Sequence, residues 1–282
     1  MARICTPLLR AAWRTHSGRV GAVILGLVVA MALLAGALGQ HDPTRQPFRD
    51  QALAGPSWEH LLGVDAVGRD FFTRLLYGAR QTLAIAAGAM LFSIVAGGAL
   101  GAAGGFLGGG ADRIIAAAAD FLIAFPPIVL GIVTLTILGP STRGVVCAVG
   151  IAGAPMMIRQ VRAAYLEQAA QDYCQAARAL GASRLRIALR HILPNCLDVF
   201  IVLAAVQLGA AILEAAGLSY LGLSGEPDQP EWGLMLRREQ VYLRVAPRYC
   251  VAPGVAIALT VLGSNLLADG LQEARRRLAR RR

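Results

Sequence analysis

The chain contains little charge, and none of its positive charge comes from lysine. Only 16% of its 282 residues are charged, and all 27 basic residues are arginine, whereas a soluble domain of this size carries roughly a quarter charged residues. Long apolar runs are separated by segments that hold almost all the arginines and acids. Because lipid offers no partners for unpaired backbone groups or charges, this pattern is typical of a polytopic helical membrane protein. A soluble helical protein, whose helices alternate polar and apolar faces, is disfavoured.

Cysteine and histidine are too scattered in the sequence to indicate a site. The five cysteines are odd in number and form no CxxC pair and no Cys/His cluster. The sequence therefore predicts neither a zinc site nor a disulfide framework, and we expect no metal site. Ser219 and the histidines His16, His41, His60 and His191 fall in separate segments, without a paired nucleophile and base. No catalytic residue is predicted.

Two function classes are disfavoured by what is missing. A net charge of +10 suggests nucleic-acid binding, but here the arginines flank apolar spans instead of forming a soluble basic face, so we expect no nucleic-acid partner. Without lysine the chain has no P-loop of the GxxxxGK[ST] type. We therefore expect it to hydrolyse no ATP and to be no enzyme.

Six apolar runs predict membrane spans, since about 20 helical residues cross the hydrocarbon core. The predicted transmembrane helices cover about 20–39, 82–106, 113–138, 143–160, 197–216 and 250–268. The first run follows a basic tail but is longer than the apolar region of a signal peptide, so we interpret it as an uncleaved anchor. The predicted fold class is an all-α polytopic membrane protein.

Arginine counts in the connecting segments predict the orientation. With the N-terminus inside, the inner segments hold 17 arginines and the outer segments hold 10. Since basic residues favour the cytoplasmic side, both termini are predicted to be cytoplasmic. An outer segment of about 40–80 and an outer loop of about 217–249 follow from this topology.

The second span carries glycine on one helical face. Gly97, Gly101, Gly105 and Gly109 recur every four residues. Without side chains, that face lets a neighbouring helix approach closely. Asp112 follows these glycines, and we expect its carboxylate to cap the next helix.

The most informative polar segment on the inner side covers 158–196. Its alanines favour helix, Gly181 breaks the run, and Ser183 can cap a new helix that continues through Arg190. Pro194 is expected to stop this helix before the next span. The sequence predicts two short helices with a bend, lying beneath the membrane.

Two interpretations of this segment remain open at the level of residue chemistry. Small alanines near the bend let the element sit deep in a groove of another protein, where Arg178, Arg184, Arg186 and Arg190 can pair with acids. Alternatively, the segment is an amphipathic helix that rests on anionic lipid headgroups.

A spaced motif runs through this segment: Gln175-Ala176-Ala177, Gly181, His191 and Leu193-Pro194. It resembles the EAA loop of ABC importer permeases, EAA-x3-G-x9-I-x-LP, at every point of the spacing. Glutamine stands in place of the family's glutamate and histidine in place of its isoleucine. The resemblance implies that about 172–190 form coupling helices that dock into a cleft of ATPase subunits. Loss of the glutamate charge puts one docking ion pair in doubt. The coupling residues that we predict are Gln175, Ala176, Ala177, Gly181, Ala182, Ser183, Arg186, His191, Leu193 and Pro194.

Further blocks resemble the C-type subunit of the peptide and nickel branch of these permeases. They are HLLGVD at 60–65, GRD at 68–70, RLLYGAR at 74–80, the GG…D…D…AFP residues at 108–126, LSYLGL at 218–223, PEWGLM at 230–235 and the residues of 253–271. The blocks cover most of residues 58–273 in family order.

The resemblance implies an importer in the bacterial inner membrane with four subunit types. This chain would pair with a second, related permease to enclose the path. Two ATP-binding subunits, which use ATP and Mg, and an extracytoplasmic substrate-binding protein would complete it. We expect the later spans to form a type I ABC importer core, this chain to bind no cofactor itself, and membrane lipid to surround it.

The substrate and the residues of the path stay open. Peptides are the first choice, with nickel or another metal complex and glutathione-like compounds as alternatives.

Tyr220 and Trp232 are interpreted either as translocation-path or gate residues or as interfacial anchors. A different class, an ion-driven secondary transporter, needs ionisable relays within the bilayer; Asp120, Glu214 and Asp269 are candidates, but all lie nearer predicted span ends than centres.

The predicted organisation has four parts. A cytoplasmic N-terminal tail covers 1–19, the first span with the outer segment covers 20–80, the permease domain covers 81–272, and a basic cytoplasmic tail covers 273–282.

Overall fold

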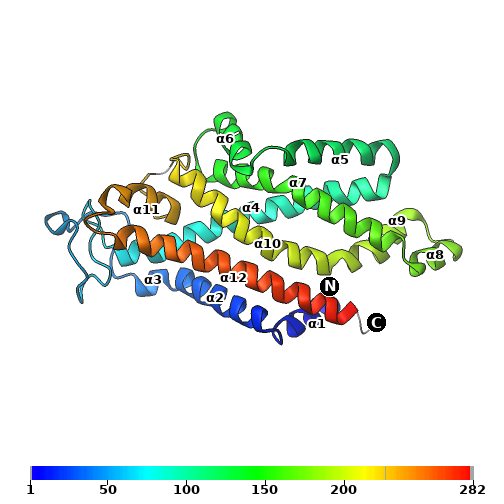
Figure 1. Cartoon of the computed structure of the whole chain (residues 1–282), viewed down its shortest axis with the longest axis horizontal. Coiled ribbons are helices and arrows are strands. Elements are labelled where there is room, and N and C mark those ends of the chain that lie inside the picture. Colours follow the sequence, from blue (N-terminus) through cyan, green and yellow to red (C-terminus); the bar gives the residue numbers. More distant parts are fainter. Residues whose placement is uncertain (1, 226, 280–282) are drawn as a thin grey trace.

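The computed structural model describes residues 2–225 and 227–279, and all of the regular elements within them are helical. The long helices run roughly along one axis of an elongated molecule (Figure 1). Both termini and the short helices α8 and α9 lie at one end, whereas α11 and the segment that joins α3 to α4 lie at the other. The last three residues of the predicted basic tail lie outside the described part of the chain.

Five helices are long and apolar enough to cross a membrane, and a bent pair supplies a sixth, broken span. The five are α2 (His16–Leu33), α4 (Phe71–Leu107), α7 (Thr142–Ala169), α10 (Leu193–Tyr220) and α12 (Arg248–Ala279). The bent pair is α5 (Gly109–Ile123) and α6 (Pro127–Leu138), which meet at 98°. The all-α fold with six predicted spans is therefore confirmed in outline.

The prediction of one continuous helix over 113–138 is wrong. Pro126 and Pro127 interrupt the apolar run, and Pro127 opens α6 at its first position, where no N–H donor is needed. Pro126 has an extended backbone (ψ 132°), because a residue that precedes proline is driven out of the helical region. The chain therefore bends between Ala124 and Pro126.

Short helices occupy the two ends of the molecule. They are α1 (Ala2–Ala12), α3 (Ala35–Leu38), η1 (Arg49–Gln51), α8 (Asp172–Ala179), α9 (Arg184–Ile187), the π-helical segment η2 (Ala188–Ile192), α11 (Trp232–Glu239) and η3 (Gln240–Tyr242). Helix α1 packs through Leu8 and Ala12 against α10 and α12, so much of the predicted N-terminal tail is structured.

Helix α4 begins well before the predicted span. Asp70 caps it by accepting from the backbone N–H of Thr73 at 2.7 Å, and α4 then continues for 37 residues. At 1.5 Å per residue this length is about 55 Å, against about 30 Å of hydrocarbon. The first turns of α4 therefore lie at the end of the molecule that carries α11 (Figure 1). We name it the outer end after the predicted orientation, and the predicted outer segment ends near residue 70.

The prediction of a glycine face for close packing is confirmed for three positions. Helices α4 and α7 form the most extensive helix contact. A Cβ atom at Gly101 would lie 2.5 Å from the carbonyl oxygen of Ile158, and Gly97 and Gly105 meet α7 equally closely. Gly109 does not belong to this face: it starts α5, has a positive φ of 57° and has open space around it.

The expectation that Asp112 caps a helix is wrong, because α5 already begins at Gly109 after a left-handed Gly108. Asp112 lies in the first turn instead and accepts hydrogen bonds from the Arg162 guanidinium of α7, with Nη2–Oδ2 at 2.7 Å. This ion pair joins the start of the broken span to α7.

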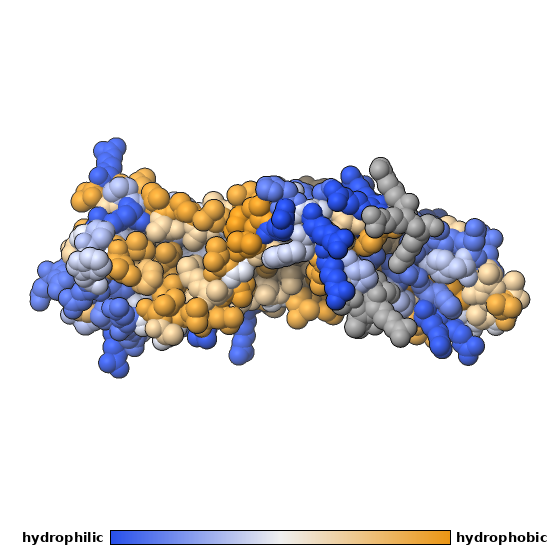
Figure 2. Space-filling model, turned by 90° about the horizontal axis from the view of Figure 1, so that it is seen from below, coloured by the Kyte–Doolittle hydropathy of each residue, from blue (hydrophilic) through white to orange (hydrophobic). Residues whose placement is uncertain are grey.

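The surface has the polarity of a membrane protein. Figure 2 shows apolar side chains over the middle of the molecule on this face, with hydrophilic side chains at the left end and over much of the right-hand part. Large apolar side chains such as Leu27, Ile114 and Ile137 are 67%, 72% and 78% exposed in the isolated chain. An exposed apolar band of this extent fits lipid or partner subunits, not water.

Candidate functional site

The α8–α9 element is a helix–turn–helix at the end of the molecule that holds both termini (Figure 1). Helix α8 ends in a Schellman motif, in which the N–H of Ala182 donates to the carbonyl of Ala177 at 3.0 Å and the N–H of Gly181 donates to Arg178 at 2.9 Å. Gly181 supplies the left-handed backbone (φ 80°) that this motif requires. The predicted bend at Gly181 is confirmed.

The second helix of the element begins at its predicted cap but does not end where expected. The Ser183 hydroxyl accepts from the N–H of Arg186 at 3.3 Å. The helix then continues through η2 into α10, so the expectation that Pro194 stops it is wrong. Inside a regular α-helix, Pro194 would have no N–H to donate, and its ring would clash with the carbonyl four residues earlier. The π-helical segment Ala188–Ile192, just before Leu193 and Pro194, changes the hydrogen-bond register at this point.

The inner face of the element packs against three long helices. Cys174 of α8 and Ile187 of α9 are buried together with Tyr165 of α7 and Cys196 of α10. On α4, Phe106 packs against the same cluster. Arg184 also donates to the Phe106 carbonyl at 3.3 Å. The element is therefore packed against α4, α7 and α10 at its base.

The exposed side of the α8–α9 element, away from the long helices, carries apolar and basic side chains together. Leu180, Leu185 and Leu189 are 87%, 57% and 59% exposed. Within the described residues, Arg178, Arg186 and Arg190 form no ion pair with a carboxylate. Exposed leucines grouped at a polar end of a molecule mark an interaction surface.

The predicted coupling residues lie along this element, some on its surface and some at its base. Gln175, Ala176, Gly181, Ser183 and Arg186 are exposed, and Ala177, Ala182, His191, Leu193 and Pro194 are half-buried. The ring of His191 lies 6.5 Å from that of Tyr173. The backbone carbonyl of His191 accepts from Asn195 at 2.7 Å.

Trp232 is neither an interfacial anchor nor a path residue in this structure. Its side chain is fully buried, and Nε1 donates to the Leu75 carbonyl at 3.0 Å. A Cβ atom at Gly78 would lie 2.7 Å from the indole ring. Trp232 therefore fixes α11 to the outer part of α4. Tyr220 is 41% exposed and donates to Gln240, so it remains accessible from outside the chain.

A buried charge network at the opposite end was not predicted as a unit. Asp65 and Arg69, 0% and 1% exposed, form an ion pair at 2.7 Å, and Arg74 lies 3.7 Å from the same carboxylate. Arg74 also donates to the Pro43 carbonyl at 2.6 Å, and Arg69 reaches Asp228 at 3.5 Å. Most of the charged residues of this network lie in the sequence blocks around 60–80 that resemble the family. The sequence alone does not show which of these residues pair with one another.

Glu239 of α11 lies next to this network. Burial raises the pKa of its carboxyl to about 7, and the nearby Asp65 charge adds to the rise while Arg69 and Arg74 oppose it. Glu239 is thus a buried acid at the outer end that titrates near neutral pH.

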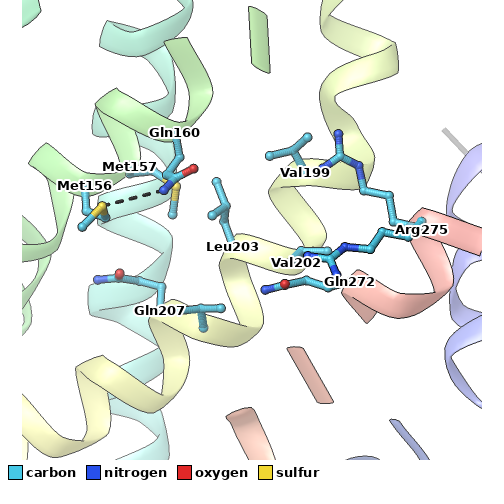
Figure 3. Close-up of a pocket in the computed structure, with 11 residues that line it drawn as sticks. Met156, Met157, Gln160, Val199, Val202, Leu203, Gln207, Gln272 and Arg275 are labelled. Atoms are coloured by element: carbon cyan, nitrogen blue, oxygen red, sulfur yellow. Dashed lines mark hydrogen bonds between the residues drawn. The ribbon is translucent and has the colours of Figure 1, made fainter. Parts of the chain in front are cut away.

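Two hollows lie along α10 and α12. One cavity of about 540 Å³ lies between α7, α10 and α12, and the amides of Gln160, Gln207 and Gln272 and the guanidinium of Arg275 surround it (Figure 3). The second hollow, of about 660 Å³, is an apolar groove between α10 and α12 that Tyr220 borders.

Comparison with known proteins identifies the family. Residues 89–281 match the model of the binding-protein-dependent transport system inner membrane component. The chain belongs to this family. It is a multi-pass inner-membrane component of a bacterial ABC importer, a transport subunit that works with ATPase subunits and a substrate-binding protein.

Relatives align over nearly the whole permease. The chain is 39% identical to the glutathione transport system permease protein GsiD of Pectobacterium atrosepticum, covering 93% of this chain and 87% of the relative. It is 37% identical to the di/tripeptide transport system permease protein DppC of Pseudomonas aeruginosa, covering 94% and 91%. The dipeptide transport system permease protein DppC of Alkalihalophilus pseudofirmus is 38% identical, with 90% and 84% covered.

A solved structure confirms the fold. A chain of the MetNI methionine ABC transporter, in an inward-facing conformation, superposes with a TM-score of 0.58 at 20% identity. The match covers 71% of this permease and 96% of that chain. The predicted type I ABC importer core is thereby confirmed as a fold.

Proposed function

We propose that this permease is the C-type subunit of a peptide importer and forms half of the translocation pathway. The relatives that support this substrate class carry names that refer to glutathione, dipeptides and di- or tripeptides. Glutathione is itself a tripeptide, so the three names share one chemistry: a short chain with amide groups and terminal charges.

The α8–α9 element is the proposed docking site for the ATPase subunits. The observation that carries this proposal is the set of exposed leucines and unpaired arginines on the element, above a buried base that contacts α4, α7 and α10. A surface patch of this composition suits a protein groove with acidic sides better than a lipid headgroup layer, because a bend at Gly181 prevents one flat amphipathic face.

The orientation and the remaining partners follow from this docking site. The end that carries α8, α9 and both termini would face the cytoplasm, in agreement with the excess of arginines in the same segments. The opposite end would receive the substrate-binding protein. The apolar groove between α10 and α12, with the accessible Tyr220 at its border, is the proposed face toward a second, related permease and the path.

In the proposed mechanism, this chain contributes movement, not chemistry. ATPase subunits that close on ATP and Mg would push the α8–α9 element. The packed base of the element would then shift α4, α7 and α10 between inward-open and outward-open arrangements. Such a mechanism needs one bistable element whose equilibrium both the ATPases and the substrate bias.

The test replaces Gly181 in the reconstituted importer. Gly181→Val strains the left-handed turn and should reduce substrate-stimulated ATP hydrolysis at least about tenfold, whereas Gly181→Asn, which tolerates this backbone, should retain most of it. Gly26→Val is the matched control, since Gly26 lies in α2 with open space beside it. Full stimulation in Gly181→Val, with ATPases bound, would refute the coupling function; dipeptide uptake without any bound ATPase would refute the importer mechanism.

A further inference from the structure

The outer segment brings together three side chains that are far apart in the sequence. His41 follows α3, His60 lies in the middle of the segment, and Asp70 caps α4. One potential ligand atom from each of the three lies within 4.8 Å of the others. The two imidazole rings have their centroids 5.3 Å apart, and Phe48 packs edge-on against both, at 5.0 and 4.4 Å.

The hydrogen bonds of this cluster are incomplete. His60 is only 3% exposed, and its Nδ1 lies 2.9 Å from Oδ2 of Asp70. Its other ring nitrogen, Nε2, is buried without a hydrogen-bond partner, and so is Nε2 of His41. An unpaired buried polar atom costs about 1–3 kcal/mol, so two of them on neighbouring rings require an explanation.

We propose that His41, His60 and Asp70 bind a divalent transition-metal ion of the Zn²⁺ class. Neutral imidazole nitrogens and a carboxylate are the donors that such ions prefer. The Asp70–His60 hydrogen bond is the arrangement in which a carboxylate fixes the tautomer of a ligating histidine and leaves its other nitrogen free for the metal. The two unpaired Nε2 atoms are then the ligands, and Asp70 orients His60 through the hydrogen bond to Nδ1.

A bound ion would tie the outer segment together at three points. It would join the chain just after α3, the centre of the segment and the first residue before α4. A structural His–Asp pair alone accounts for Nδ1 of His60, but it accounts for neither unpaired nitrogen. The sequence predicted no metal site because it lacks cysteine motifs. His41, His60 and Asp70 are 19 and 10 positions apart, so only the fold brings them together.

The experiment titrates Zn²⁺ into the purified importer complex and measures bound zinc together with the melting temperature. The wild-type complex should bind one more Zn²⁺ per copy of this chain than the His41→Gln complex does. It should also be stabilised by Zn²⁺, since an ion that binds only the folded state raises stability by mass action. His16→Gln is the matched control, because His16 is exposed at the opposite end.

A second variant separates metal binding from folding. Asp70→Asn retains an equally good helix cap and nearly the same volume, but it removes the charge behind His60. It should weaken Zn²⁺ binding about 10–100-fold while the metal-free complex melts as before. Zinc binding that is equal in wild type, His41→Gln and Asp70→Asn, or no stoichiometric zinc in the wild type, would overturn the proposal.

Discussion

The two ends of the permease treat their charged residues in opposite ways. At the outer end, Asp65, Arg69 and Arg74 are buried and paired with one another and with backbone carbonyls. At the α8–α9 end, Arg178, Arg186 and Arg190 point outward beside exposed leucines. The charges of the outer end therefore stabilise the fold of that end. At the α8–α9 end, the arginines and leucines remain free to contact a partner. Sequence blocks that resemble the same family thus serve folding at one end and, in the proposed function, docking at the other.

The largest expected effect tests whether the outer charges serve stability. Asp65→Asn removes the buried carboxylate that two buried guanidinium groups share and should destabilise the permease by about 3–5 kcal/mol. Arg186→Gln at the other end should change stability by no more than about 0.5 kcal/mol. Thermal melting of both variants in the same detergent measures the contrast. Equal melting temperatures would remove the distinction between the two ends.

The next effect tests whether the exposed leucines serve docking. Leu185→Asp places a charge on the outer face of α9, without disturbing the buried base, and should weaken ATPase binding by at least about 2 kcal/mol, roughly 30-fold. Val241→Asp, a 73% exposed position at the outer end, is the matched control and should leave ATPase binding unchanged. Copurification of the ATPase subunits with each variant is the measurement. Undiminished copurification with Leu185→Asp would place the docking surface elsewhere.

The smallest effect concerns Glu239 at the outer end. Because its pKa rises from 4.5 to about 7 in the folded protein, the folded state holds a proton that the unfolded state has lost between these values. Stability should therefore fall as pH rises from about 4.5 to 7 and then level off, by about 1–3 kcal/mol in total.

Glu239→Gln should flatten this dependence. Asp42→Asn is the control, since hydrogen bonds from Thr44 lower the pKa of Asp42 below 3.8, outside the window. Melting temperatures of the three proteins at pH 5, 6, 7 and 8 decide the matter. An unchanged slope in Glu239→Gln would assign the pH dependence to another group.

Local signals in the sequence were sufficient for the spans and for the bend. Apolar length predicted the five unbroken spans, and Gly181 with Ser183 predicted the turn and the cap of α9, because each depends on neighbouring residues only. The two prolines at 126 and 127 are a local signal for the break between α5 and α6. Because apolar residues continue on both sides of them, the apolar pattern predicted one unbroken span there.

Pairs that form over long sequence distances could not be predicted. Asp112 was expected to cap the helix that follows it, and only the packing of α5 on α7 shows that it meets Arg162, 50 residues away. The burial of Trp232 likewise depends on how α11 folds back onto α4. For the α8–α9 element, the sequence predicted the helices but not the division between a buried base and an exposed face.

The glycines of α4 have a mechanical consequence. Where Gly97 and Gly101 bring the backbone of α4 against that of α7, no side chain of α4 lies between the two helices to absorb sliding or rotation of one helix past the other. We therefore expect α4 and α7 to move as one rigid body. The 98° break between α5 and α6 and the π-helical segment before α10 are two joints outside this pair at which the chain can bend during a transport cycle.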